Sequence, residues 1–195
     1  MARLGQGERV RSILDAALAV FAQSGYHGAR MSDIARAAAV ADGTVYLYFR
    51  NKRELLVAAF RQGFAGYLEG LEAALAGAPD ARVELSRLVR FHLAFLGERR
   101  ALARVAQVEL RQSDPEVRAA VHAVIAPYFR RMDAIVARGR AEGVLRADVD
   151  PRVVRRMVFG TLDECVSAWV DARHPYPLTA VADDVERLLL GGIEA

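Results

Sequence analysis

The chain has 195 residues, of which 53% are hydrophobic and 8% aromatic, with one cysteine and a formal net charge of +3. This length allows one domain or two around a substantial core, and a single cysteine excludes an internal disulfide. No apolar run approaches the roughly 18 residues of a membrane span and no apolar segment follows the N-terminal arginines, so we expect no membrane partner and a cytoplasmic location.

Positive charge is concentrated at the N-terminal end. Residues 1–53 carry eight Lys and Arg against four Asp and Glu, whereas the rest of the chain carries 19 against 20. Such an asymmetry is typical of a domain that contacts nucleic-acid phosphates.

The first three predicted helices are short and close together. Residues 8–24 have apolar residues at helical spacing, and Gly25 ends that helix. Ser32 is the predicted N-cap of a second helix, residues 42–43 break it, and Thr44 starts a third that ends at Phe49. Two helices of this length cannot bury their own apolar faces, so the pattern predicts a helix-turn-helix that leans on the first helix.

A capping box opens the next helix, with Asn51 as N-cap and Glu54 at the third position. Lys52 and Arg53 then occupy its first turn, where the partial positive charge of the helix N-terminus disfavours cations. Either these side chains contact phosphates or they extend into solvent.

The rest of the chain is also predicted to be helical. We expect one long helix over residues 51–76 that acts as a rigid lever, with glycines at 63, 66 and 70 that allow either close packing or room for a ligand. Further helices are predicted at 81–96, 100–112, 115–141, 150–172 and from a Thr179 cap to 191. The expected fold class is therefore all-α, with about nine helices and no strand.

Catalytic and metal-binding patterns are absent from the sequence. The four histidines lie far apart, no cysteine pair exists, and Cys165 has no neighbouring histidine to activate it. We expect no enzyme activity, no metal and no cofactor.

The run GTVYLYFRNK at residues 43–52, followed by ELL at 54–56, resembles the signature of the TetR family of bacterial transcriptional repressors. The resemblance implies a DNA-binding domain at residues 1–50 and an effector-binding and dimerisation domain at 51–195, with the third helix in the major groove of operator DNA. The residues expected to contact DNA are Arg30, Ser32, Gly43, Thr44, Tyr46, Tyr48 and Lys52.

A closer resemblance involves VADGT at residues 40–44, QVELRQS at 107–113 and FGTLDE at 159–164. These segments are similar to the TetR-family repressors of fatty-acid degradation, which implies release from DNA by long-chain acyl-CoA. Arginines would then bind the CoA phosphates, from a set left open: Arg99, Arg100, Arg104, Arg111, Arg118, Arg130 and Arg131. The expected effector-binding residues are Phe64, Phe91, His92, Phe95, Val105, Val108, Leu110, Arg111, Met132 and Phe159.

Several alternatives stay open at this point. The aromatic residues equally suit an ordinary core, and Arg111 equally suits a helix C-terminal cap. A different hydrophobic effector, such as a drug-like cation or an aromatic acid, would use buried carboxylates, for which Glu109, Asp163 and Glu164 are candidates. A helical acyl-CoA carrier or hydrolase is the alternative from another functional class.

The last two helices are expected to form a homodimer, because their apolar residues exceed what one neighbour can cover. These residues are Val154, Val158, Leu162, Trp169, Val185, Leu188 and Leu189. Filling an apolar tunnel would move the helix 51–76 and shift both recognition helices away from the spacing of about 34–36 Å between adjacent major grooves.

Overall fold

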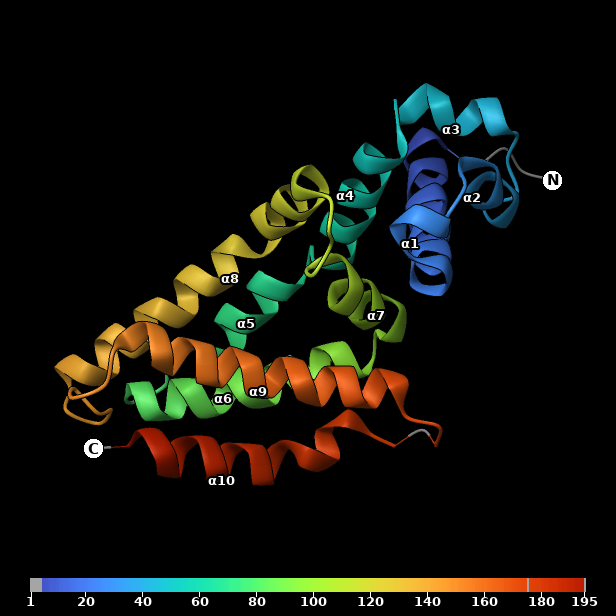
Figure 1. Ribbon diagram of the computed structural model, residues 1–195. Helices are drawn as coiled ribbons and strands as arrows, with labels where there is room; N and C mark the ends of the chain where they lie inside the picture. Colours follow the sequence, from blue (N-terminus) through green and yellow to red (C-terminus); the bar gives the residue numbers. More distant parts are fainter. Residues whose placement is uncertain (1–4, 175, 195) are drawn as a thin grey trace. The chain divides into compact units, whose positions relative to one another are not determined.

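The computed structural model describes residues 5–174 and 176–194, and every regular element in that part of the chain is helical (Figure 1), which confirms the all-α prediction. The described helices are α1 Gln6–Gly28, α2 Met31–Ala37, α3 Asp42–Tyr48, α4 Lys52–Gly63, α5 Tyr67–Leu75, α6 Ala81–Gly97, α7 Arg100–Glu109, α8 Pro115–Ala141, α9 Pro151–Asp171, the 3-10 helix η1 Leu178–Val181 and α10 Ala182–Ile193. Within this described part, no helix has both the length and the apolar character needed to cross a membrane.

The chain folds into two compact units. The first holds α1 to α4 together with Arg104–Val124, and the second holds Gly66–Ala103 and the chain from Ile125 onward. The predicted boundary at residue 50 concerns the division between DNA binding and effector binding, so it stays a prediction.

In the first unit, α1 supplies the apolar surface on which the two short helices pack. The fully or largely buried residues of α1, α2 and α3 are Ile13, Leu14, Ala17, Phe21, Ile34, Ala35 and Val45. Burial of these side chains stabilises helices that are too short to persist alone. The helix-turn-helix predicted from the periodicity is therefore present, although its boundaries differ.

Both short helices start earlier than predicted. Arg30 takes the N-cap position of α2 without a side-chain cap bond, so Ser32 lies inside the first turn and its prediction as N-cap is wrong. α3 starts at Asp42 and not at Thr44, because a carboxylate in the first turn favours a helix. The chain reverses instead at Ala39, whose φ of 53° lies in the left-handed region.

The single long helix predicted over residues 51–76 is wrong. The chain forms α4 and α5 with a turn between them, because Gly63 and Gly66 weaken the helix within four residues of each other. A rigid lever that runs from Lys52 through both halves is therefore not part of this structure. Gly70 within α5 serves close packing, since a Cβ there would lie 2.9 Å from the Phe91 ring.

The last helix also differs from the prediction. Thr179 lies within η1 and does not cap α10, which starts at Ala182. Of the seven apolar residues expected to face a second copy, only Leu188 is exposed, at 77%. The other six are buried within the chain itself: Val154, Val158, Leu162, Trp169, Val185 and Leu189.

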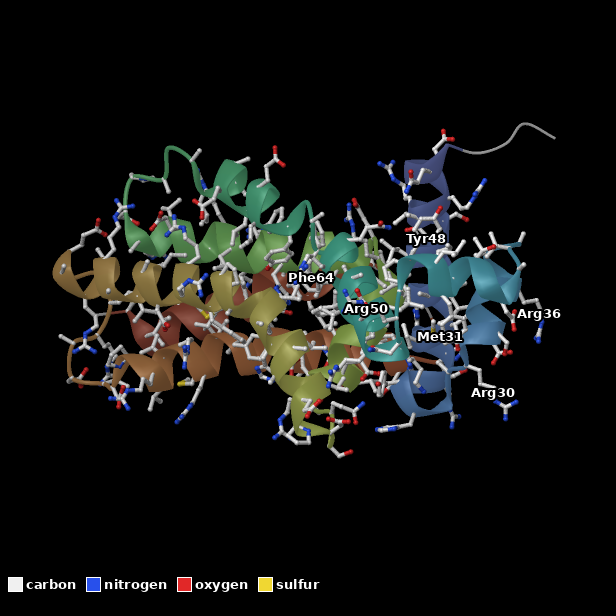
Figure 2. All side chains as sticks on the ribbon, turned by 90° about the horizontal axis from the view of Figure 1, so that it is seen from above. Arg30, Met31, Arg36, Tyr48, Arg50 and Phe64 are labelled. Carbon is white, nitrogen blue, oxygen red and sulfur yellow. The ribbon has the colours of Figure 1, made fainter. Side chains whose placement is uncertain are left out.

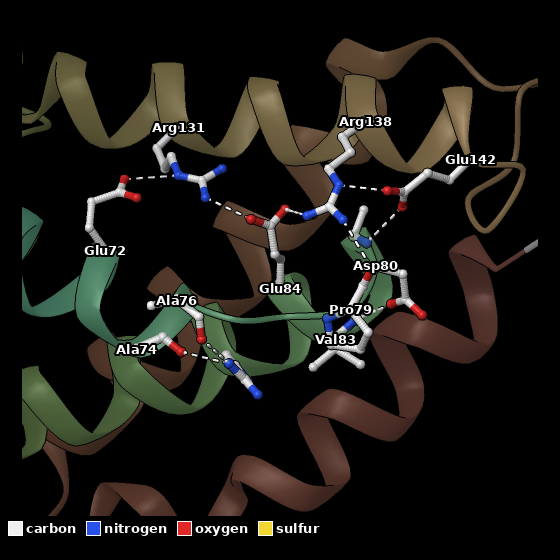
Figure 3. A network of polar contacts seen from close by, with 12 residues as sticks. Glu72, Ala74, Ala76, Pro79, Asp80, Val83, Glu84, Arg131, Arg138 and Glu142 are labelled. Atoms are coloured by element: carbon white, nitrogen blue, oxygen red, sulfur yellow. Dashed lines mark hydrogen bonds and ion pairs between the residues drawn. The ribbon is translucent and has the colours of Figure 1, made fainter.

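A network of ion pairs ties helices of the second unit together (Figure 3). Glu84 on α6 is buried, and its carboxylate lies 2.7 Å from Arg131 Nη2 and 3.3 Å from Arg138 Nη1 on α8. Arg131 also pairs with Glu72 on α5, and Arg138 pairs with Glu142. Two arginines therefore offset the cost of burying one carboxylate.

Substituting Glu84 should destabilise the second unit. Glu84→Ala should lower the free energy of unfolding by about 2–3 kcal/mol, because Arg131 loses its buried partner and keeps only Glu72. Arg138→Ala should have a much smaller effect, since the Arg138 side chain is 40% exposed and Arg131 still pairs with Glu84. Urea unfolding of both variants gives their free energies of unfolding. Equal losses in the two variants would contradict the prediction that the buried partner, Glu84, matters more than the exposed one.

Candidate nucleic-acid interface and ligand site

Helix α3 buries one side and exposes the other. Val45 is fully buried, while Tyr46 and Leu47 are 55% and 80% exposed. Gly43 is exposed too, and a Cβ there would meet nothing within 4 Å, so another molecule can approach the backbone closely. Leu47 was absent from the predicted DNA contacts, although the helical period that buries Val45 already places it on the outer face.

Two exposed arginines lie at opposite ends of α2, Arg30 at the N-cap and Arg36 in the last turn. Arg30 and Arg36 point away from the ribbon of α2 (Figure 2). Arg36 lies 3.3 Å from Asp33 in an exposed ion pair, which contributes little to stability. Arg36 is not among the residues that the sequence predicts to contact DNA.

Lys52 has intramolecular partners. Its Nζ donates to the carbonyl oxygens of His27 at 3.2 Å and Ala29 at 2.9 Å, and lies 4.7 Å from the centre of the Tyr26 ring. This cation at the start of α4 therefore binds carbonyls at the end of α1, where positive charge is favourable. Asn51 caps α4 as predicted, accepting from Glu54 N–H at 2.9 Å.

A cavity of about 480 Å³ adjoins the start of α4 in the first unit. Arg50, Arg53 and Arg61 line it together with one carboxylate, Glu54. Glu54 accepts from the Arg50 N–H at 2.9 Å, and Arg53 pairs with Glu116 of α8. The cavity is thus positively charged on balance.

The predicted effector-binding residues are divided between the two units. The first unit holds Phe64, Val105, Val108, Leu110 and Arg111, and the second holds Phe91, His92, Phe95, Met132 and Phe159. In the first unit Val105 is buried and Val108 is 44% exposed. Arg111 Nη1 donates to the Gln107 carbonyl at 3.1 Å, which fits the alternative of a helix C-terminal cap.

In the second unit, two tyrosines absent from the prediction join the predicted residues. Tyr67 lies 5.2 Å from Phe91 and 4.9 Å from Phe95 between ring centroids. Tyr128 lies 5.3 Å from Tyr67 and 6.4 Å from Phe159. These rings form an aromatic cluster across α5, α6, α8 and α9, in which Tyr67 and Tyr128 are buried and the three phenylalanines are half-buried.

His92 is a polar group within this cluster. Its Nδ1 lies 2.8 Å from the Tyr67 hydroxyl, and its ring stacks with Tyr128 at 5.6 Å. Burial lowers the pKa of His92 from 6.5 to about 4, although the carboxylate of Asp163 opposes this shift. Burial also raises the pKa of Tyr67 and of Tyr128, so all three side chains are neutral near pH 7.

The depressed pKa of His92 predicts that acid weakens the fold. In the unfolded chain His92 gains a proton below about pH 6.5, whereas the folded state resists protonation down to about pH 4. The free energy of unfolding should therefore fall by up to about 3 kcal/mol between those pH values.

The measurement is urea unfolding from pH 7 to pH 4, with His92→Phe as the comparison. The variant should lose this part of the pH dependence, whatever its stability at pH 7. An identical pH dependence in both proteins would exclude His92 as the titrating group.

Comparisons with known proteins bear on what these surfaces do. Residues 13–59 match the bacterial regulatory proteins of the tetR family, and residues 60–192 match the C-terminal region of YsiA-like proteins. The fatty acid metabolism regulator protein of Bacillus subtilis (strain 168) is 38% identical over 181 residues, 93% of each chain.

Solved structures agree with this match. The fatty acid degradation regulator FadR from Bacillus halodurans is 40% identical, covers 93% of this chain and 98% of its own, and superposes with a TM-score of 0.85. FadR from Bacillus subtilis, solved in complex with stearoyl-CoA, is 37% identical over 94% of this chain and 98% of its own, with a TM-score of 0.86. Both resemblances drawn from the motifs are thereby confirmed, and the chain belongs to the tetR family of bacterial regulatory proteins, with a C-terminal region of the YsiA-like type.

Proposed function

We propose that this protein is a dimeric transcriptional repressor of fatty-acid degradation genes that long-chain acyl-CoA releases from operator DNA. Its similarity along nearly the whole chain to fatty-acid regulators, one of them solved with stearoyl-CoA, carries this proposal. The protein would act by binding and not by catalytic turnover.

The outer face of α3 suits the reading of base edges. Tyr46 and Leu47 are exposed side by side, and an exposed apolar side chain can contact the methyl group of thymine. Thr44 and Tyr48 flank them on the same short helix, and Gly43 allows close approach of the backbone. Arg30, Ser32 and Lys52 would contact phosphates on either side.

Salt dependence of operator binding separates phosphate contact from support of the fold. Arg30→Ala should weaken binding to all sequences and reduce the slope of log K against log salt by about one, since one phosphate contact is lost. Lys52→Ala should do the same, because two of its three N–H donors bind carbonyls and the third is left for a phosphate.

The control is Arg87→Ala, because Arg87 binds carbonyls of the α5 end in the second unit and should leave both affinity and slope unchanged. Fluorescence anisotropy with a labelled operator duplex at several salt concentrations gives the slopes. A weaker affinity with an unchanged slope would restrict Lys52 to its contacts with His27 and Ala29.

The part of the chain proposed to bind the effector, residues 51–195, holds both aromatic side chains and arginines. An acyl chain gains about 0.8 kcal/mol for each CH₂ group that it buries, which favours its packing against half-buried aromatic side chains such as Phe91, Phe95 and Phe159. Five of the seven candidate arginines bind other groups of the chain. Arg131 pairs with Glu84 and Glu72. The other four donate to backbone carbonyls, Arg99 to Phe95, Arg100 to Val170, Arg111 to Gln107 and Arg118 to Gln112.

A cationic effector is less well supported. Glu109 accepts from Tyr26 N–H and from Gln112, and Glu164 is exposed, so neither presents a buried unpaired carboxylate to a cation. Asp163 is buried, and it lies close enough to His92 to raise the pKa of that ring.

A second copy of the chain would pack on exposed apolar residues of α9 and α10. Val153, Met157 and Leu188 are 41%, 47% and 77% exposed. A Cβ added at Gly160 or Gly191 would meet nothing within 4 Å, so these glycines leave room for a neighbouring helix. Two linked recognition helices supply affinity that one half-site lacks.

Chain length tests the proposed effector. Palmitoyl-CoA should release operator DNA at far lower concentration than lauroyl-CoA, and acetyl-CoA should leave the complex intact, because the switch draws on burial of methylene groups. Full switching needs about 5.5 kcal/mol of differential affinity, which roughly seven methylenes supply.

Titration of a preformed complex by anisotropy gives the release curves, with CoA alone and palmitate alone as controls. By reciprocity, operator DNA should weaken palmitoyl-CoA binding by the same factor. Equal release by acetyl-CoA and palmitoyl-CoA would refute the proposal.

A further inference from the structure

The last turn of α1 is detached from the rest of that helix. Gly25 has φ 65° and ψ 172°, a left-handed conformation that favours glycine. An unbroken helix would direct the Tyr26 N–H at the carbonyl of Ala22. The break removes that acceptor, and Tyr26 N–H donates instead to Glu109 Oε1 at 2.9 Å.

Glu109, the last residue of α7, is completely buried. Its second oxygen accepts from Gln112 Nε2 at 2.8 Å, and Gln112 Oε1 in turn lies 3.0 Å from His27 Nε2 and accepts from Ser113 N–H at 2.9 Å. A buried carboxylate is costly unless its oxygens are hydrogen-bonded. The position of the detached turn and that of residues 109–113 therefore depend on each other.

The opposite side of the same turn is held by the start of α4. Lys52 Nζ donates to the carbonyls of His27 and Ala29 and covers the Tyr26 ring. Arg30, the N-cap of α2, follows directly in the chain. A displacement of the turn would thus move the first residues of both α2 and α4, which lie beside the residues expected to contact phosphates.

We propose that Glu109 is a positioning residue for operator binding, which holds the turn 25–29 in place from the end of α7. Movement of residues 109–113 away from Tyr26 would release the turn and lower operator affinity. The regulatory part of this inference, in which acyl-CoA causes that movement, rests on the proposed function.

The pairing of donors and acceptors permits a sharp test. In Glu109→Gln, the new amide nitrogen faces the amide nitrogen of Gln112. Rotation of either amide moves the conflict to the N–H of Tyr26 or of Ser113. Operator affinity should fall about tenfold, as expected for unmatched buried polar groups. The affinity is measured by anisotropy on a duplex that the wild-type protein selects from random DNA.

Exchanging the two side chains should restore binding. In Glu109→Gln with Gln112→Glu, residue 109 still accepts from Tyr26 N–H and now donates to the carboxylate at 112, which still accepts from Ser113 N–H. Operator affinity should return to within about threefold of the wild type. If Glu109→Gln does not fold, Gln112→Ala removes only one partner of Glu109 and should also weaken operator binding.

Glu84→Gln is the matched control, since Glu84 is a buried carboxylate in the other unit. Glu84→Gln should lower the thermal unfolding midpoint and leave operator affinity unchanged at temperatures where the protein is folded. Operator affinity of Glu109→Gln equal to that of the wild type would overturn the inference. An equal loss of operator affinity in Glu84→Gln, at equal stability, would also overturn it. So would an exchanged variant whose operator affinity stays as low as that of Glu109→Gln.

Calorimetry with palmitoyl-CoA and no DNA separates this inference from the proposed function. Glu109→Gln should bind palmitoyl-CoA at least as tightly as the wild type, because the contact that the ligand would break is already weakened, while the ratio of operator affinities without and with palmitoyl-CoA should fall. A wild-type ratio in Glu109→Gln would overturn the regulatory part. Absence of palmitoyl-CoA binding to the wild type would refute the proposed function, and the operator affinities would still decide the role of Glu109.

Discussion

Burial of the apolar stripe of α1 is the interaction on which the DNA-binding helices depend. α2 and α3 have seven residues each, and isolated helices below about 12 residues are marginal in water. Their positions are therefore determined by what they bury, chiefly Ile34, Ala35 and Val45. Because one face of α3 is buried in the core, the opposite face is exposed to solvent, and no other contact is needed to orient it.

The helix-turn-helix could be predicted because the sequence patterns that indicate it lie close together in the chain. Helical spacing of apolar residues, the Asn51 cap and the clustered positive charge all lie within about fifty consecutive residues. The helix starts were less predictable, since Ser32 and Thr179 have the right side chains for caps but lie one or two residues inside the helices that tertiary packing selects. The partners of Lys52 are backbone carbonyls more than twenty residues away, and no sequence pattern identifies those.

The division of the predicted helix 51–76 has a related cause. Phe60, Phe64 and Leu68 continue the apolar period across the glycines, so periodicity indicated one helix while helix propensity opposed it. In the second unit, Phe91, Phe95 and Phe159 were predicted to bind the effector, whereas Tyr67 and Tyr128 were not. The Tyr67 hydroxyl gains a role only beside His92 from α6, and the Tyr128 ring stacks on that histidine. Proximity across helices is a property of the fold and cannot be seen in the sequence.

The partners of Lys52 have a chemical consequence. Lys52 is the single lysine of the chain, so reagents that acylate amines can modify only this side chain and the chain terminus. Its ammonium group is half-buried against two carbonyls, and acylation would remove the charge that these carbonyls attract. The rate at which Lys52 is acylated would therefore report how firmly its ammonium group is bound to the carbonyls at the end of α1. An acyl group on Lys52 would prevent these contacts from forming again.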